Sequence, residues 1–456
     1  MLHSAAAMTA KYPCQSPDAA SRDGERPLVG DGHAAAARAD KPRRPVVVRR
    51  VDECANIGEL LTHCLPAFGG AFLRRIYTIL DEAIGAGCPL TLSIAGPVTV
   101  SGQHLAWLIP LLETGWVAYL STTDAVCYHD GHRSLDAFSE KPGPIHEVPI
   151  FGDDGALRDE RTIRVTDMAF DEDVLLHQDQ FVSACFQRPE FQKRMTGTEM
   201  RYLLGRYYAA QEAKNGVPAG LLATCNRLAL PIFVGAPGDG SVFLNSMKLW
   251  AMHKAGLIER YDFELDLHAE VFESCAYHYW GLFDHPAQAL GTMILGGGVP
   301  KNYNLQPEPA LGQVLGLPDV RGYAFDVQIV SAPVTDGSLS SCPPAEAVTW
   351  GKVDRDVYQS TTESMQADYS TVMPLLVKAL LDNRARYAEW ASRMGEEALF
   401  EKHPRARGYL RPREGYRLFE KREELASRLV AEVAKNKTWL LETLRYPLAA
   451  AEPSGQ

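Results

Sequence analysis

The chain has 456 residues, of which 46% are hydrophobic and 23% are charged, a composition typical of a globular protein with a substantial buried core. Its formal net charge is −11, which argues against nucleic-acid binding as the main function because phosphate backbones require a basic face. No apolar run is long enough to span a bilayer and the first residues lack a signal-peptide core, so we expect a cytoplasmic protein without membrane segments.

Residues 1–45 are rich in Ala, Asp, Arg, Gly and Pro and show no apolar periodicity, which predicts a disordered leader. The whole chain contains nine cysteines, an odd number, and none of them has CxxC spacing. This pattern predicts reduced, mostly buried thiols and neither a disulfide framework nor a zinc site.

Residues 46–383 alternate between short β-rich runs and amphipathic helical patterns. The predicted strands are Pro89–Ala95, Val117–Thr122, Pro231–Val234, Thr292–Leu295 and Tyr323–Val330. The predicted helices between them include Ala71–Ile84, Gln103–Glu113, Ser241–Lys254 and Ala269–Phe283. This alternation predicts an α/β fold, with a Rossmann-like parallel sheet covered by helices on both faces. Ligands of such sheets bind beyond the carboxyl ends of the strands.

Three segments depart from this alternation. Residues 138–164 are rich in Pro, Gly and Asp, which predicts a loop or flap, and the helical patterns Asp171–Cys185 and Thr196–Glu212 form an insertion between two strands. After Asn383 the chain becomes charged and helical, so we expect residues 384–456 to form a C-terminal extension that packs on the core or mediates assembly.

Three glycines, Gly296–Gly298, directly follow a predicted strand. They allow close approach of the backbone to a phosphate, although a simple tight turn explains them equally well because the GxGxxG pattern is absent. Asp239 and Asp368 each stand just before a predicted helix, where they are either N-caps or ligand contacts. His129 and His132 lack helical i, i+4 spacing and a third ligand, so we predict a polar pocket there and no metal site.

Lys352 follows Trp350 by two residues and Glu346 by six, in a segment that is otherwise poor in cations. A lysine becomes a nucleophile only when its surroundings lower its pKa. The carboxylate and the indole would lie on one helical face, where they suit an organic ammonium group through charge pairing and cation–π attraction.

Read together, these segments resemble the deoxyhypusine synthase family, and in particular its bacterial deoxyhypusine synthase-like branch. The resemblance covers residues 46–383 and rests on Ser121–Thr123, Tyr128–Asp130, Ala236–Ser241, Leu295–Asn302, Gln306–Pro309, Ser331–Ala332, Asp336–Gly337 and Pro344–Lys352. It implies a sirtuin-like Rossmann fold, NAD as cofactor and a homotetramer with active sites at subunit interfaces. It also implies aminobutyl transfer from a polyamine such as spermidine, through an imine on Lys352, to an acceptor amine.

The resemblance also assigns roles to individual residues. The positions that match cofactor contacts are Thr122, Thr123, Asp239, Gly296, Gly297, Gly298, Ser331, Ala332, Asp336 and Asp368. The positions that match or adjoin substrate contacts are Tyr128, Ser241, Asn302, Ser340, Glu346 and Trp350. Lys352 is the predicted imine-forming residue, and His129 is the second catalytic candidate, as a base or a hydrogen-bond partner.

Several positions depart from the family pattern. Tyr128 and His129 replace a pair of glutamates, Asn302 replaces a histidine, and Leu339 and Leu244 replace two aspartates. The amine pocket thereby loses negative charge, so the donor or the acceptor is expected to differ. A free amine such as putrescine as acceptor would make the enzyme a homospermidine synthase. An NAD-binding regulatory protein without turnover is the alternative from another class.

Overall fold

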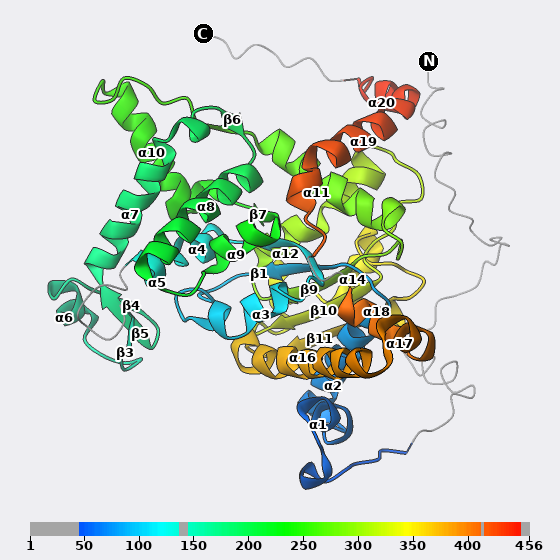
Figure 1. Cartoon of the computed structure of the whole chain (residues 1–456). Coiled ribbons are helices and arrows are strands. Elements are labelled where there is room, and N and C mark those ends of the chain that lie inside the picture. Colours follow the sequence, from blue (N-terminus) through cyan, green and yellow to red (C-terminus); the bar gives the residue numbers. More distant parts are fainter. Residues whose placement is uncertain (1–44, 136–144, 412–414, 448–456) are drawn as a thin grey trace, which may run out of the picture. The chain divides into compact units, whose positions relative to one another are not determined.

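A sheet of six parallel strands lies at the centre of the fold, as the sequence predicts (Figure 1). The computed structural model describes residues 45–135, 145–411 and 415–447, so all but the last residue of the predicted leader lie outside the described residues. The strand order is β11-β10-β9-β1-β2-β7. The strands are β1 (Leu90–Ile94), β2 (Val117–Thr122), β7 (Ile232–Val234), β9 (Gly291–Leu295), β10 (Phe325–Val330) and β11 (Thr362–Gln366).

Edge strand β11 is the one strand of this sheet that the sequence analysis missed. Its sequence, Thr-Glu-Ser-Met-Gln, contains a single apolar residue, and the strand is only partly buried. A partly buried edge strand does not need the continuous apolar run by which the other strands are recognised.

The two faces of the sheet differ in chemistry. Side chains alternate between the faces of a strand, and the register aligns Leu92 with Leu120 and Met293 on one face. On the other face Thr91 aligns with Thr292, and Thr292 aligns with Asp326. The sheet therefore has an apolar face and a polar face, and both are buried.

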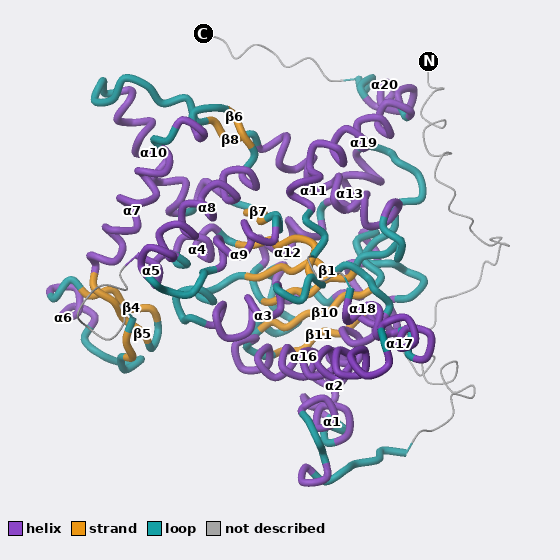
Figure 2. Tube along the Cα trace, in the orientation of Figure 1, coloured by secondary structure: helices purple, strands orange, loops and turns teal. Residues whose placement is uncertain are grey.

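Helices enclose both faces (Figure 2). The apolar face packs in one core cluster with residues of α2 (Phe68–Gly85), α16 (Tyr369–Met394) and the π-helical turn η3 (His104–Leu108), which continues into α3 (Ile109–Leu112). The polar face is covered by α12 (Gly298–Leu305), with α11 (Leu267–Tyr279) packed against Tyr119 and Phe233 at the other end of the sheet.

Asn304 fixes α12 on the polar face. Its side-chain amide donates hydrogen bonds to the hydroxyls of Thr91 at 3.1 Å and Thr292 at 2.9 Å. Its side-chain oxygen accepts from the Ser121 hydroxyl at 3.4 Å, and its backbone oxygen accepts from Tyr323 at 3.0 Å. One buried side chain thus joins α12 to three neighbouring strands.

The insertion is more ordered than the sequence predicts. Residues 138–144 lie outside the described part of the chain, but the rest of the predicted loop contains α6 (Asp154–Asp159) and two strands of a small antiparallel sheet, β3 (His146–Glu147) and β4 (Thr162–Val165), which pair with β5 (Met168–Asp171). The loop prediction is therefore wrong over residues 145–164. These strands are too short and too exposed to show a hydrophobic period.

The remaining elements complete the insertion and the helical layers. In the insertion, α7 (Glu172–Phe186) and α8 (Gly197–Asn215) agree with the predicted helices to within three residues. The others are α1 (Ile57–His63), α4 (Asp124–Tyr128), α5 (Gly131–Leu135), β6 (Arg194–Met195), α9 (Leu221–Leu228), α10 (Ser241–Lys254), β8 (Glu264–Leu265), α13 (Pro307–Pro309), α14 (Pro344–Ala347), α15 (Tyr358–Thr361), α17 (Glu396–Lys402), α18 (Arg405–Leu410), α19 (Arg422–Lys435) and α20 (Lys437–Thr443).

The structure shows no break at residue 383. Helix α16 runs without interruption through Asn383, and the described residues from Val47 onward belong to one compact unit. The Trp116 indole donates to the backbone oxygen of Tyr409 at 3.3 Å, and the two rings meet edge to face. Leu425 and Leu429 of α19 join the core around Tyr277. The described part of the extension therefore completes the core.

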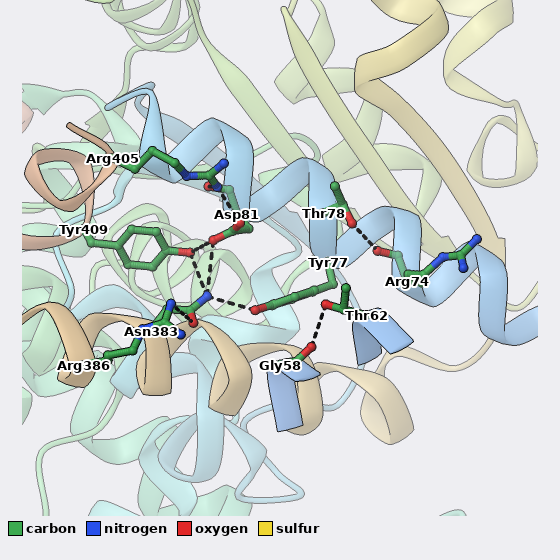
Figure 3. A network of polar contacts seen from close by, with 10 residues as sticks. All are labelled: Gly58, Thr62, Arg74, Tyr77, Thr78, Asp81, Asn383, Arg386, Arg405 and Tyr409. Carbon is green, nitrogen blue, oxygen red and sulfur yellow. Dashed lines mark hydrogen bonds and ion pairs between the residues drawn. The ribbon is translucent and has the colours of Figure 1, made fainter. Parts of the chain in front are cut away.

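A polar network holds α16 and α18 against α2 (Figure 3). Asp81 of α2 accepts hydrogen bonds from Tyr409 and from Arg405. Asn383 of α16 donates to Asp81 at 3.2 Å and to Tyr77 at 2.9 Å. Because Asn383, Tyr77 and Tyr409 are all buried, each group depends on the others for its hydrogen bonds.

We expect Asn383→Leu to lower the free energy of unfolding by about 2 kcal/mol, because the buried Tyr77 hydroxyl loses its donor and Asp81 loses one of its three. Urea denaturation followed by circular dichroism measures this change. Arg393→Gln is the matched control on the same helix, since it breaks only the exposed ion pair with Glu389 and should change stability little. Equal midpoints for the two variants would contradict the assigned role of the network.

Candidate active site

The glycine turn after β9 has a conformation that only glycine adopts readily. Gly296 and Gly297 have φ angles of 65° and 68°. A Cβ on Gly297 would lie 2.3 Å from the Cβ of Ala95, so there is no room for a side chain. The turn leads into α12, whose first turn has no side-chain cap. Its free backbone N–H groups are therefore available to an anionic ligand.

The other predicted cofactor residues lie at the same carboxyl edge of the sheet, because all six strands run parallel. Thr122 ends β2, and its hydroxyl donates to the backbone oxygen of Ile94 at 2.8 Å within the sheet. Thr123 follows it and is half-buried. Ser331 and Ala332 directly follow β10. The structure thus brings together strand ends that are separated by more than 200 residues in the sequence.

Three aspartates of this edge differ in their contacts. Asp368 N-caps α16 by accepting from the backbone N–H of Ser370 at 2.8 Å, so the capping alternative is confirmed for this residue. Asp336 accepts from the backbone N–H of Ser338 at 3.0 Å within its own loop. Asp239 is exposed and does not cap α10, since Asp124 accepts from the backbone N–H of Val242 at 2.8 Å there. All three side chains are exposed, and Asp368 and Asp336 already accept hydrogen bonds from nearby backbone N–H groups.

Lys352 is half-buried and held near α12. Its Nζ lies 3.3 Å from the Oδ1 of Asn302, and 5.9 Å from the centre of the Trp350 ring. Burial lowers the pKa of Lys352, while the charges of Cys342 and Glu308 oppose this shift. The direction favours the neutral amine that a nucleophile requires.

A cavity of about 570 Å³ joins Asn302 to the glycine turn. It is lined by Gly235, Ala236, Gly298, Val299, Asn302, Tyr303, Gln306 and Leu339. Asn302 therefore contacts Lys352 on one side and the cavity on the other. Leu339 places an apolar side chain in this wall, at a position where the sequence analysis noted the loss of an aspartate.

Ser340 and the Glu346–Trp350 segment lie around the same helix. The loop that carries Ser340 packs on the start of α12, where a Cβ on Gly298 would lie 3.4 Å from the Ser340 nitrogen. Glu346 of α14 is exposed, and Trp350 exposes 67% of its surface. These groups are open to a ligand that approaches from solvent. Ser241 is the first residue of α10, beside the turn that contains Asp239.

Tyr128 contacts the insertion, and His129 contacts a second histidine nearby in the chain. The Tyr128 hydroxyl donates to Asp179 of α7 at 2.8 Å, and the Nδ1 of His129 lies 3.3 Å from the Nε2 of His132. Asp130 between them accepts from the backbone N–H groups of Leu221 and Leu222 at the start of α9. None of these contacts reaches Lys352, so the structure gives no support to grouping the two residues with it.

Four buried polar residues near Lys352 were given no role by the sequence analysis. Lys301 is 2% exposed, and its ammonium donates to Gln328 at 2.6 Å and to the backbone oxygen of Cys342 at 2.5 Å. Burial raises the pKa of Asp326 to about 7, against the charge of Lys301. Burial likewise raises the pKa of Glu308 to about 7. The available signal was Asp326 and Gln328, which are polar at alternate positions of a central strand.

Among the residues that the structure describes, no group of three or more His, Cys, Asp or Glu side chains is arranged to hold a metal ion. The helices described in the same ranges include none that is long and apolar enough to cross a membrane.

Comparison with known proteins returns one family model, described as deoxyhypusine synthase, which matches residues 60–380. A deoxyhypusine synthase-like protein from Nostoc sp. is 36% identical over 331 residues, or 72% of this chain and 82% of the relative. A deoxyhypusine synthase-like protein from Cyanothece sp. is 33% identical over 371 residues, or 77% of this chain and 88% of the relative. A “Probable deoxyhypusine synthase 1” from Methanosarcina mazei is 26% identical over 316 residues, or 69% and 87%.

We expect Gly297→Ala to lower the free energy of unfolding by about 2 kcal/mol, because the added methyl group meets Ala95 and the residue has a left-handed φ. Thermal unfolding measures the change. Gly238→Ala, in the nearby turn after β7, is the control because a Cβ there meets no atom within 4 Å. A Gly297→Ala protein as stable as this control would show that the turn can relax.

Proposed function

The chain belongs to the deoxyhypusine synthase family, and from this premise we propose that it is an NAD-dependent aminoalkyl transferase that acts on a polyamine through an imine on Lys352. The observation that carries this proposal is the position of Lys352. Its half-buried amine contacts Asn302, one turn along the helix that begins at the glycine turn. The amine of Lys352 and the glycine turn therefore adjoin the same helix, α12.

The residues of the carboxyl edge fit a dinucleotide. The uncapped start of α12 and the close turn at Gly296 and Gly297 suit a pyrophosphate, and Asp239 is free to accept from a hydroxyl. Thr123, Ser331 and Ala332 provide further strand-end contacts. When bound, NAD would supply the acceptor for a hydride of the polyamine and return that hydride at the end of the reaction.

Lys352 would attack the oxidised amine carbon as a neutral amine and hold the aminoalkyl group until an acceptor amine displaces it. Asn302 orients the amine through the contact at 3.3 Å. Trp350 and Glu346 are exposed beside it, where an indole face and a carboxylate would hold the distal ammonium of a polyamine. We retain the cytoplasmic location and a homotetramer with interfacial sites as parts of this proposal.

The wall of the cavity favours a second candidate within the same chemistry. Leu339 and Asn302, which both line the cavity, are uncharged at positions where the family resemblance implies charged or titratable side chains. A site with fewer carboxylates would bind a smaller or less charged amine, and this supports putrescine as acceptor, with homospermidine as product.

We expect incubation with NAD and labelled spermidine or putrescine, followed by borohydride reduction, to place the label on the peptide that contains Lys352. Lys352→Ala should remove the label to background, a loss of roughly 100-fold or more, because no other amine takes its place. The same variant should keep its affinity for NAD, measured by calorimetry, since Lys352 lies outside the predicted cofactor contacts. Mass spectrometry of the peptides reads the label.

Lys378→Ala is the control for this experiment, because Lys378 forms an exposed ion pair with Asp382 and should keep full labelling. Labelling that survives Lys352→Ala would refute the imine mechanism. If no polyamine labels the wild-type protein while NAD still binds, the protein is an NAD-binding regulatory protein. Analysis of the released amine then distinguishes aminobutyl transfer to putrescine from transfer to a protein lysine.

A further inference from the structure

Glu308 of α13 is a buried carboxylate in contact with the segment that carries Lys352. Only 8% of the surface of Glu308 is exposed. Its Oε2 has no hydrogen-bond partner among the described residues. An unsatisfied buried carboxylate oxygen is costly, so its retention calls for an explanation.

Gly351, the residue directly before Lys352, leaves room for this carboxylate. A Cβ on Gly351 would lie 2.7 Å from the Oε1 and 2.8 Å from the Oε2 of Glu308, so any other residue at this position would push the carboxylate away. Gly351 also has a φ of 78°, which favours glycine. The backbone directly before Lys352 is therefore shaped around Glu308.

Asn302 and Glu308 approach Lys352 from consecutive turns of the same helical run. Asn302 contacts the amine from α12, and Glu308 reaches the preceding residue from α13, which follows α12 directly. The amide cannot take up a proton under ordinary conditions, whereas the carboxylate can. Asn302 can therefore orient the amine, whereas Glu308 has the chemistry to exchange a proton.

We propose that Glu308 is the proton-exchange partner of Lys352, an inference that rests on the function proposed above. The carboxylate takes one proton from the Lys352 ammonium, which leaves a neutral carboxylic acid and a neutral amine with its electron pair free. The amine then attacks the oxidised substrate carbon, the bond from that carbon to the polyamine nitrogen breaks, and the rest of the polyamine leaves as an amine. When the acceptor displaces the aminoalkyl group, the carboxylic acid returns the proton to the departing lysine nitrogen. Each cycle leaves both groups as they began.

The electrostatic surroundings support this exchange. Burial raises the pKa of Glu308 to about 7, against the charge of Lys352, and burial lowers the pKa of Lys352. The pKa values of Glu308 and Lys352 thereby move closer together, which makes proton transfer between them near neutral pH easier. The other titratable groups that face the pair are Cys342, on the loop before α14, Lys301 on α12 and Glu346 on α14.

Two rates in a Glu308→Gln variant test the proposal. The first is the rate of Lys352 alkylation by propionaldehyde and cyanoborohydride, measured against pH by peptide mass spectrometry without NAD or polyamine. Since the Glu308 carboxylate raises the pKa of Lys352, its removal should lower that pKa and speed this alkylation severalfold at neutral pH. The second is the rate of NAD- and polyamine-dependent labelling, which should fall roughly 100-fold because the proton acceptor is lost.

Glu212→Gln is the matched control. Glu212 is also buried, also has one unpartnered oxygen, and also has its pKa raised by burial to about 7, but it contacts Ser134 and Gly220 far from Lys352 in the chain. This variant should leave both rates unchanged. Circular dichroism and the urea midpoint establish that both variants are folded.

The proposal is supported if alkylation becomes faster and labelling becomes slower in Glu308→Gln, while neither rate changes in Glu212→Gln. If labelling stays at the wild-type rate, or if Glu212→Gln loses as much, the proposal is overturned. A pH profile of alkylation that is the same in Glu308→Gln and in the wild-type protein also overturns it, because the two groups are then uncoupled. If the wild-type protein takes no polyamine label at all, the proposed function fails, and the aldehyde profile still decides whether Glu308 and Lys352 interact.

Discussion

A polar side chain buried on a sheet must find hydrogen-bond partners, and this requirement organises the catalytic half of the molecule. The polar face of the sheet carries hydroxyls and an amide that form hydrogen bonds with side chains of helix α12. Asn304 meets three of the hydroxyls and thereby fixes the position and rotation of that helix. An apolar face would have allowed α12 to slide by a residue at little cost, whereas a set of directional bonds does not.

Everything proposed for the site depends on that fixed helix. Its start forms the cradle after the glycine turn, its second turn carries Lys301 and Asn302, and its continuation carries Glu308. A shift of α12 along the sheet would separate the cofactor edge from the amine. Buried polar contacts of this kind add less to stability than to the choice of a single arrangement. Here that arrangement defines the distance between the glycine turn at the start of α12 and the amine of Lys352.

The sequence predicted the central strands because each needs an apolar run to be buried on a covered sheet, and it predicted α10 to the residue. It could not reveal β11, whose single methionine gives no pattern, or the small exposed sheet at residues 145–171. The boundary expected at Asn383 followed from a change in composition. The structure shows that α16 crosses this point because its polar side chains serve the network around Asp81.

Within the candidate site, local patterns located Lys352 and the glycine turn, since an amine beside an indole and three consecutive glycines are visible in the sequence. Glu308 carries no such mark, and Asp326 is marked only by its polar position in a central strand. Their significance comes from burial and from neighbours that are distant along the chain, which only the fold supplies. Tyr128 and His129 show the reverse case, since the family resemblance pointed to them while Tyr128 contacts Asp179 of the insertion and His129 contacts the neighbouring His132.

The contact between Tyr409 and Asp81 joins residues that are 328 positions apart. A ribosome delivers the chain in order, so α2 and the first strands emerge long before α16 and α18, which cover them, have been made. During that interval the apolar face of the sheet is exposed to other nascent chains. Completion of the core therefore waits for the end of synthesis, and a premature stop after Lys352 would yield a protein that holds its proposed nucleophile yet cannot close its core.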